Sequence, residues 1–75
     1  MSRLPRPTGK EIMRFLERHS FTLVRVRGSH HFFRKGSLHT SVPVHSKQTV
    51  PVGTLLAILE DIKMGREEFI RLWQE

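Results

Sequence analysis

The stretch FTLVRVR-GS-HHFFRK-GS-LHTSVPVH, residues 21–45, decides the fold. It holds three segments, 21–27, 30–35 and 38–45, and each is separated from the next by Gly-Ser. Many of their residues are β-branched or aromatic, which favours strands, and a two-residue link that begins with glycine favours a tight hairpin. The sequence therefore predicts a three-stranded antiparallel meander. Pro43 cannot donate to a strand ladder, so it indicates an edge strand or a strand end.

Helical patterns flank the meander on both sides. Thr8-Gly9-Lys10-Glu11 fits the capping box that opens a helix, and an apolar stripe at helical spacing follows it up to Ser20. Pro51 suits the first turn of a second helix, whose apolar residues lie between Leu55 and Ile62. Gly65 interrupts this pattern, and residues 66–73 read as a short final helix. The predicted order is α-β-β-β-α with one additional terminal helix, an α+β fold.

A sheet of three strands cannot leave both faces bare. Each main helix carries one apolar stripe, so we expect both helices to pack on the same face and the other face to stay open to water. Alternation along the first strand assigns Val24 and Val26 to the covered face, and Arg25 and Arg27 to the open face.

Size and composition restrict the class of protein. Seventy-five residues predict a single domain, 1–75, whose residues 1–7 form an irregular arm rich in proline and arginine. The chain has no cysteine, no segment that reads as a signal peptide and no apolar run long enough for a membrane span, so we expect a cytoplasmic protein without a membrane partner. Residues 1–35 contain nine Lys or Arg against two Glu, a charge that suits a polyanion such as nucleic acid.

Two adjacent histidines, His30 and His31, follow the first Gly-Ser turn. Histidine has the unperturbed pKa nearest neutrality, so it can both take and give a proton. Neighbours on a strand point to opposite faces, and both faces carry a phenylalanine, so periodicity does not choose between the two imidazoles. Residues 21–50 contain no Asp or Glu and the chain has no thiolate, so we expect neither a metal site nor a cofactor.

Acid–base chemistry without a metal suits RNA, because RNA carries its own nucleophile in the 2′-hydroxyl. One imidazole could move the protons, and nearby cations could bind RNA and stabilise the charged phosphorane; the candidates are Arg25, Arg27, Arg34 and Lys35. Gly28 and Ser29 supply the supporting turn. The alternatives are a non-catalytic RNA-binding module of the same fold and a small protein whose basic face meets an acidic protein partner.

Several motifs in order resemble those of the HicA toxins of bacterial toxin–antitoxin systems, over about residues 9–69. They are the helix opening at Thr8–Glu11, Gly28-Ser29-His30-His31-Phe32-Phe33 after Val26-Arg27, Val42-Pro43-Val44-His45, and Gly53-Thr54-Leu55-Leu56-Ala57-Ile58-Leu59. The resemblance implies a double-stranded-RNA-binding-domain-like fold. It also implies a type II toxin that acts as an mRNA interferase, a metal-independent endoribonuclease, and a HicB-type antitoxin that masks the catalytic histidine.

The family's catalytic histidine follows its Gly-Ser, which makes His30 the corresponding residue here, with Gly28 as the matching glycine. We expect the toxin alone to be monomeric and messenger RNA to be its substrate. The roles of His31 and His45 stay open at this point.

Overall fold

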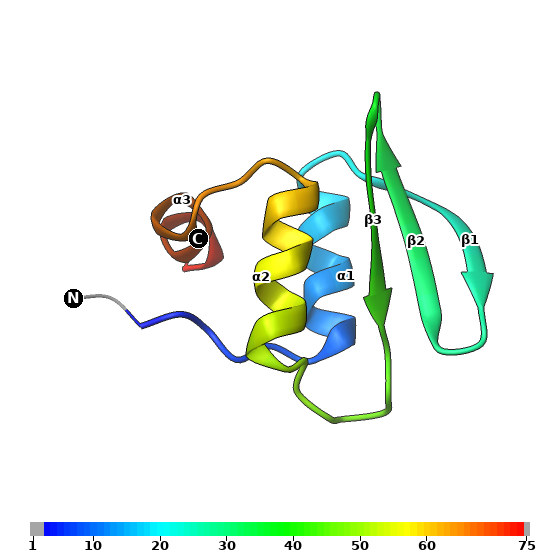
Figure 1. Ribbon diagram of the computed structural model, residues 1–75, viewed down its shortest axis with the longest axis horizontal. Coiled ribbons are helices and arrows are strands. Elements are labelled where there is room, and N and C mark those ends of the chain that lie inside the picture. The colour runs from blue at the N-terminus through cyan, green and yellow to red at the C-terminus, as the bar shows by residue number, and fades with distance from the viewer. Residues whose placement is uncertain (1–2, 75) are drawn as a thin grey trace.

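The computed structural model, which describes residues 3–74, is an α+β fold with an open three-stranded sheet. Its elements are α1 (Gly9–Arg18), β1 (Thr22–Arg27), β2 (His30–Lys35), β3 (Leu38–Pro43), α2 (Val52–Asp61) and α3 (Arg66–Trp73). The strands are antiparallel in the order β1-β2-β3, which confirms the predicted meander. Both main helices lie on one side of the sheet, with β3 nearest to them and β1 farthest away (Figure 1).

The first helix begins and ends at local signals in the sequence. Thr8 caps α1: its Oγ1 accepts from the Glu11 N–H at 3.2 Å, and its own N–H donates to Glu11 Oε1 at 2.8 Å. At the other end, Ser20 adopts a left-handed φ of 73°, and the Phe21 N–H donates to the Leu16 carbonyl at 2.9 Å. This 6→1 hydrogen bond is the mark of a Schellman motif, which satisfies carbonyls that the helix leaves unpaired.

Both hairpin turns use glycine for its conformational freedom. Gly28 has a φ of 61° and Gly36 a φ of 60°, whereas the serine that follows each of them keeps a negative φ. Glycine at the first central position, alone in having positive φ, fits the type II′ turn that suits the twist of antiparallel strands. A side chain at Gly28 would meet no atom within 4 Å, so the turn requires glycine for its backbone angle and not for space.

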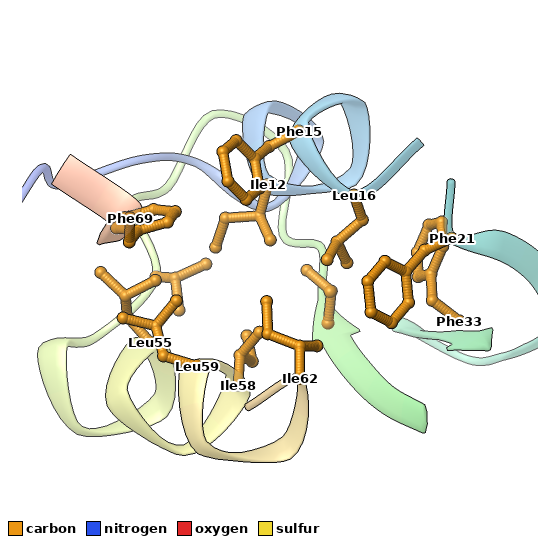
Figure 2. Close-up of a cluster of buried hydrophobic side chains, with 12 residues drawn as sticks. Ile12, Phe15, Leu16, Phe21, Phe33, Leu55, Ile58, Leu59, Ile62 and Phe69 are labelled. Carbon is orange, nitrogen blue, oxygen red and sulfur yellow. The ribbon is translucent and has the colours of Figure 1, made fainter. Parts of the chain in front are cut away.

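The core lies between the sheet and the two main helices. Phe33 from β2 and Val42 from β3 are fully buried there, together with the stripes of α1 and α2 (Figure 2). The buried apolar residues of the cluster are Ile12, Phe15, Leu16, Phe21, Phe33, Val42, Val50, Leu55, Ile58, Leu59, Ile62 and Phe69. The third helix joins the core through Phe69 and Trp73, whose rings lie 5.0 and 5.6 Å from that of Phe15, centroid to centroid.

The prediction that Val24 and Val26 lie on a covered face is wrong, because these side chains are 56% and 53% exposed. A β-bulge between Leu23 and Arg25 leaves Val24 without a partner on β2. Val26 does point to the helix side, since it pairs with His31, but β1 is the strand farthest from the helices and nothing covers it there (Figure 1). Every residue of β1 is exposed.

Two further boundaries differ from the sequence pattern. The third strand ends at Pro43, not at residue 45, although the Val44 N–H still donates to the Ser29 carbonyl at 2.8 Å. The break after α2 comes at Lys63, which has a φ of 59°, whereas Gly65 serves as the N-cap of α3. In the N-terminal segment, residues 3–7 form neither helix nor strand, yet Pro7 is fully buried and its carbonyl accepts from the Val50 N–H at 2.8 Å.

Candidate catalytic and RNA-binding face

The register of the strands decides which residues share the uncovered side of the sheet. Phe33 is fully buried against the helices, so its neighbours on β2 point the other way. Residues directly opposite each other in an antiparallel sheet share a face. The pairings therefore place on the uncovered side, hereafter the open face, the residues Thr22, Arg25, Arg27, His30, Phe32, Arg34, His39, Ser41 and Pro43.

His30 lies on this open face at the first position of the central strand. It is exposed, and it pairs with Arg27 on one side and Pro43 on the other. The Gly28-Ser29 turn connects Arg27 to His30, so the hairpin itself sets the two residues opposite each other on one face of the sheet. Such a pair can act on one phosphodiester, since the imidazole exchanges protons and the guanidinium binds negatively charged oxygens.

His31 lies on the opposite side of the sheet. It is half-buried and shares its face with Val26 and Val42, and its Nδ1 lies 3.3 Å from the Ser29 carbonyl oxygen. A carbonyl can only accept, so this contact requires the proton on Nδ1. The same carbonyl accepts from the Val44 N–H, so the Ser29 carbonyl joins the turn to the end of β3. The sheet separates the two adjacent imidazoles, and they cannot serve one site.

The arginines gather on the open face and the predicted lysine does not. Arg25 lies with its guanidinium carbon 5.5 Å from the centroid of the Phe32 ring, and the Arg34 Nε donates to the Gly36 carbonyl at 3.1 Å. Lys35 points to the helix side, where its Nζ lies 5.6 Å from the centroid of the Phe21 ring. Of the four cations predicted to bind RNA, the structure brings Arg25, Arg27 and Arg34 onto the face of His30.

Two other histidines lie near the sheet. His39 is exposed on the open face and pairs with Arg34, at the end of the sheet away from His30. His45 is exposed in the loop after β3, and it lines a hollow of about 120 Å³ together with Pro43, the partner of His30. His45 therefore lies near the end of the sheet at which His30 begins the central strand.

The three strands contain no Asp or Glu, so the open face takes only positive charge from them. Asp61 at the end of α2 is hydrogen-bonded to the third strand, since its Oδ2 accepts from the Thr40 Oγ1 at 2.9 Å. Among residues 3–74, no three His, Cys, Asp or Glu side chains come together in a group that could hold a metal ion. Within the same range, no helix has the length and apolarity to cross a membrane.

Alternation along the second strand groups Phe32 and Arg34 with His30, but the sequence did not indicate that this face is the open one or that His39 belongs to it. Alternation left open which phenylalanine faced the core, and the register across both hairpins was needed to decide it. The one available signal was the length of the two Gly-Ser links, because two-residue hairpins determine which residues pair.

A protein-family model matches most of this chain. No curated protein sequence shows a significant match to this chain. The family model described as "HicA toxin of bacterial toxin-antitoxin" matches residues 9–64, which includes all three strands, both main helices and the Gly28-Ser29-His30 turn. The match covers well over half of the chain, so the chain belongs to the HicA family of toxins from bacterial toxin–antitoxin systems.

Proposed function

We propose that this toxin is a metal-independent endoribonuclease that cleaves messenger RNA, with His30 as its acid–base catalyst. The observation that supports this most is the exposure of His30 on an uncovered sheet face, in one row with Arg27 and without a carboxylate from any strand. A carboxylate beside the imidazole would repel the RNA backbone. The surrounding arginines attract it.

In the proposed reaction, the 2′-oxygen of a ribose attacks the adjacent phosphorus and the bond from phosphorus to the 5′-oxygen breaks. The His30 imidazole takes the proton from the 2′-hydroxyl and returns it to the departing 5′-oxygen. The products are a 2′,3′-cyclic phosphate and a 5′-hydroxyl, so atoms and protons balance without water or a metal. Arg27, the neighbour of His30, stabilises the negative charge that develops on the phosphorane oxygens.

The antitoxin that the family implies is a protein that binds the toxin and blocks this chemistry. We propose a HicB-type antitoxin that covers the open face, because access of RNA to His30 requires that face to be free. The toxin would act in the cytoplasm, as a monomer when released. Gly28 and Ser29 take part only as the turn that sets Arg27 beside His30.

The test replaces one imidazole and compares it with another. His30→Ala should lower RNA cleavage by about 10²–10⁴-fold, the usual contribution of a positioned general acid–base group. His19→Gln is the control, because His19 lies at the end of α1, where its ring packs against Phe15 at 4.4 Å between centroids. Circular dichroism should show that both variants are folded. Unchanged cleavage by His30→Ala would remove His30 from the mechanism.

Three further measurements separate this proposal from its alternatives. A substrate with 2′-deoxyribose at the cleaved position should resist cleavage, and a chelator should leave the activity of the parent unchanged. Loss of activity in the chelator with rescue by a divalent ion would contradict the metal-free reaction. His45→Gln tests whether the imidazole at the same end of the sheet assists. An RNA-binding module without catalysis would bind RNA and release no cyclic phosphate.

A further inference from the structure

A groove of about 620 Å³ lies on the sheet, and several of its walls belong to the open face. Its walls include Arg25, Phe32, Arg34, His39 and Ser41, which the strand register places on this face, and Asp61 also lines it. The acid–base chemistry proposed above uses none of these side chains, so the groove calls for a separate explanation.

Phe32 is the first unusual feature of the groove. It is half-buried although no helix covers its side of the sheet, and the Arg25 guanidinium lies 5.5 Å above the centroid of its ring. A phenylalanine on a water-facing strand position contributes little to the core. A flat ring beside a cation is, however, the arrangement on which nucleic-acid bases stack in proteins that bind single strands.

The charges of the groove favour a phosphate near Arg34. The Arg34 Nε donates to the Gly36 carbonyl at 3.1 Å, which holds the guanidinium against the turn, and His39 is its direct partner across the strands. An arginine keeps four further N–H donors when one is used. Asp61, the one carboxylate of the groove, is already engaged by the Thr40 hydroxyl at 2.9 Å and lies away from β1.

The spacing of the rows connects the groove to His30. Side chains two residues apart on β2 are separated by about 7 Å along the strand. His30, Phe32 and Arg34 therefore form three successive steps on one face of the same strand. The two steps from His30 to Arg34 add up to about 14 Å, which is longer than one nucleotide. An extended RNA strand whose phosphate lies at His30 then has a neighbouring base over Phe32 and a phosphate further along the strand near Arg34.

We propose that this groove is a binding site for an unpaired nucleotide of the RNA substrate, next to the phosphate that is cleaved. Its base stacks on the Phe32 ring beside the Arg25 guanidinium, and a phosphate further along the strand binds Arg34 and His39. The inference rests on the proposed function for its substrate class. It adds that the toxin binds RNA as a single strand, because a base held in a duplex could not reach the ring.

The test measures RNA binding separately from cleavage. In the His30→Ala background, fluorescence anisotropy with a short fluorescein-labelled single-stranded RNA of mixed sequence gives the dissociation constant. Phe32→Leu, which keeps an apolar side chain and removes the ring, should weaken binding about tenfold or more, and Phe32→Trp should preserve it. Val26→Ala is the control, because Val26 is an exposed apolar residue that lies on the other side of the sheet.

Two more variants keep the proposal testable if Phe32→Leu does not fold. Arg25→Gln removes the cation above the ring and should also weaken binding. Arg34→Gln should reduce the slope of log affinity against log salt by about 0.7, the value for one phosphate contact on a single strand. Both positions are exposed, so neither substitution disturbs the core.

The outcomes separate the two proposals. Binding that survives both Phe32→Leu and Arg25→Gln overturns the nucleotide site, even if the parent cleaves RNA through His30. Binding that depends on Phe32 while the parent releases no cyclic phosphate supports the nucleotide site and contradicts the cleavage reaction. If Phe32→Leu weakens only the complex with the antitoxin, the groove is a protein-docking surface and the inference is wrong.

Discussion

Gly9 is the position at which one added methyl group should test the packing of this fold most sharply. It is the first residue of α1 and is buried against the end of β3. A Cβ atom built at Gly9 would lie 2.4 Å from the Pro43 carbonyl oxygen and 2.9 Å from the Val44 Cα. Both are backbone atoms, so no side-chain rotation can relieve the overlap.

The size of the effect follows from that geometry. An ordinary contact begins near 3.4 Å, so the first turn of α1 must move away from β3 by about 1 Å in Gly9→Ala. Overpacking of this kind costs about 1–3 kcal/mol, and alanine recovers up to about 1 kcal/mol through its higher helix propensity. We therefore expect a net loss of about 1–2 kcal/mol in the free energy of unfolding, which lowers Tm by about 4–16 °C in a domain of this size.

Gly53 provides the matched control. It is the second residue of α2, and a Cβ atom there would meet no atom within 4 Å. Gly53→Ala should therefore be neutral or raise stability by up to about 1 kcal/mol. Urea unfolding followed by circular dichroism at 222 nm measures both variants under the same conditions. If Gly9→Ala is as stable as Gly53→Ala, the close contact between α1 and β3 is not a constraint and the reasoning fails.

Two other substitutions test how α2 is held. Lys63 has a left-handed φ of 59° after the last turn of α2, where the Met64 N–H donates to the Leu59 carbonyl at 3.0 Å. Lys63→Gly should raise the free energy of unfolding by about 1 kcal/mol because glycine adopts this φ without strain, and an equal gain in Lys63→Ala would contradict that cause. Thr40→Val should lower stability by about 1 kcal/mol because it removes the hydrogen bond to Asp61, whereas Thr40→Ser keeps the hydroxyl and should retain most of that bond in thermal unfolding.

Local signals account for the parts of the fold that the sequence predicted. The Thr8 capping box begins α1, the two Gly-Ser links form the hairpins, and residues 66–73 form α3 as predicted. Each of these features depends on residues within about four positions of one another, where capping and turn chemistry act. Arg25 and Arg27 do share the open face, as alternation indicated, because both follow the bulge and keep a regular register with β2.

Features that depend on distant residues were beyond the sequence pattern. The exposure of Val24 and Val26 results from a bulge and from the limited width of a layer of two helices, neither of which leaves a local signal. The register across both hairpins determines that Phe33, and not Phe32, is buried. Because His30 points to the side of the sheet opposite to Phe33, it lies on the open face. The assignment of His30 as the catalyst remains a prediction.

His30 has an exposed side chain, but its backbone lies between two neighbouring strands. It begins the central strand, and β1 and β3 flank it through Arg27 and Pro43. The Pro43 carbonyl lies close to Gly9 at the start of α1. The packing of α1 against β3 therefore supports the strand residue that pairs with His30. A reactive group gains from such support, because catalysis requires its atoms to stay within a fraction of an ångström of the productive geometry. His45, in the loop that follows β3, has no such pair of neighbouring strands, and this favours His30 over His45 as the main catalytic imidazole.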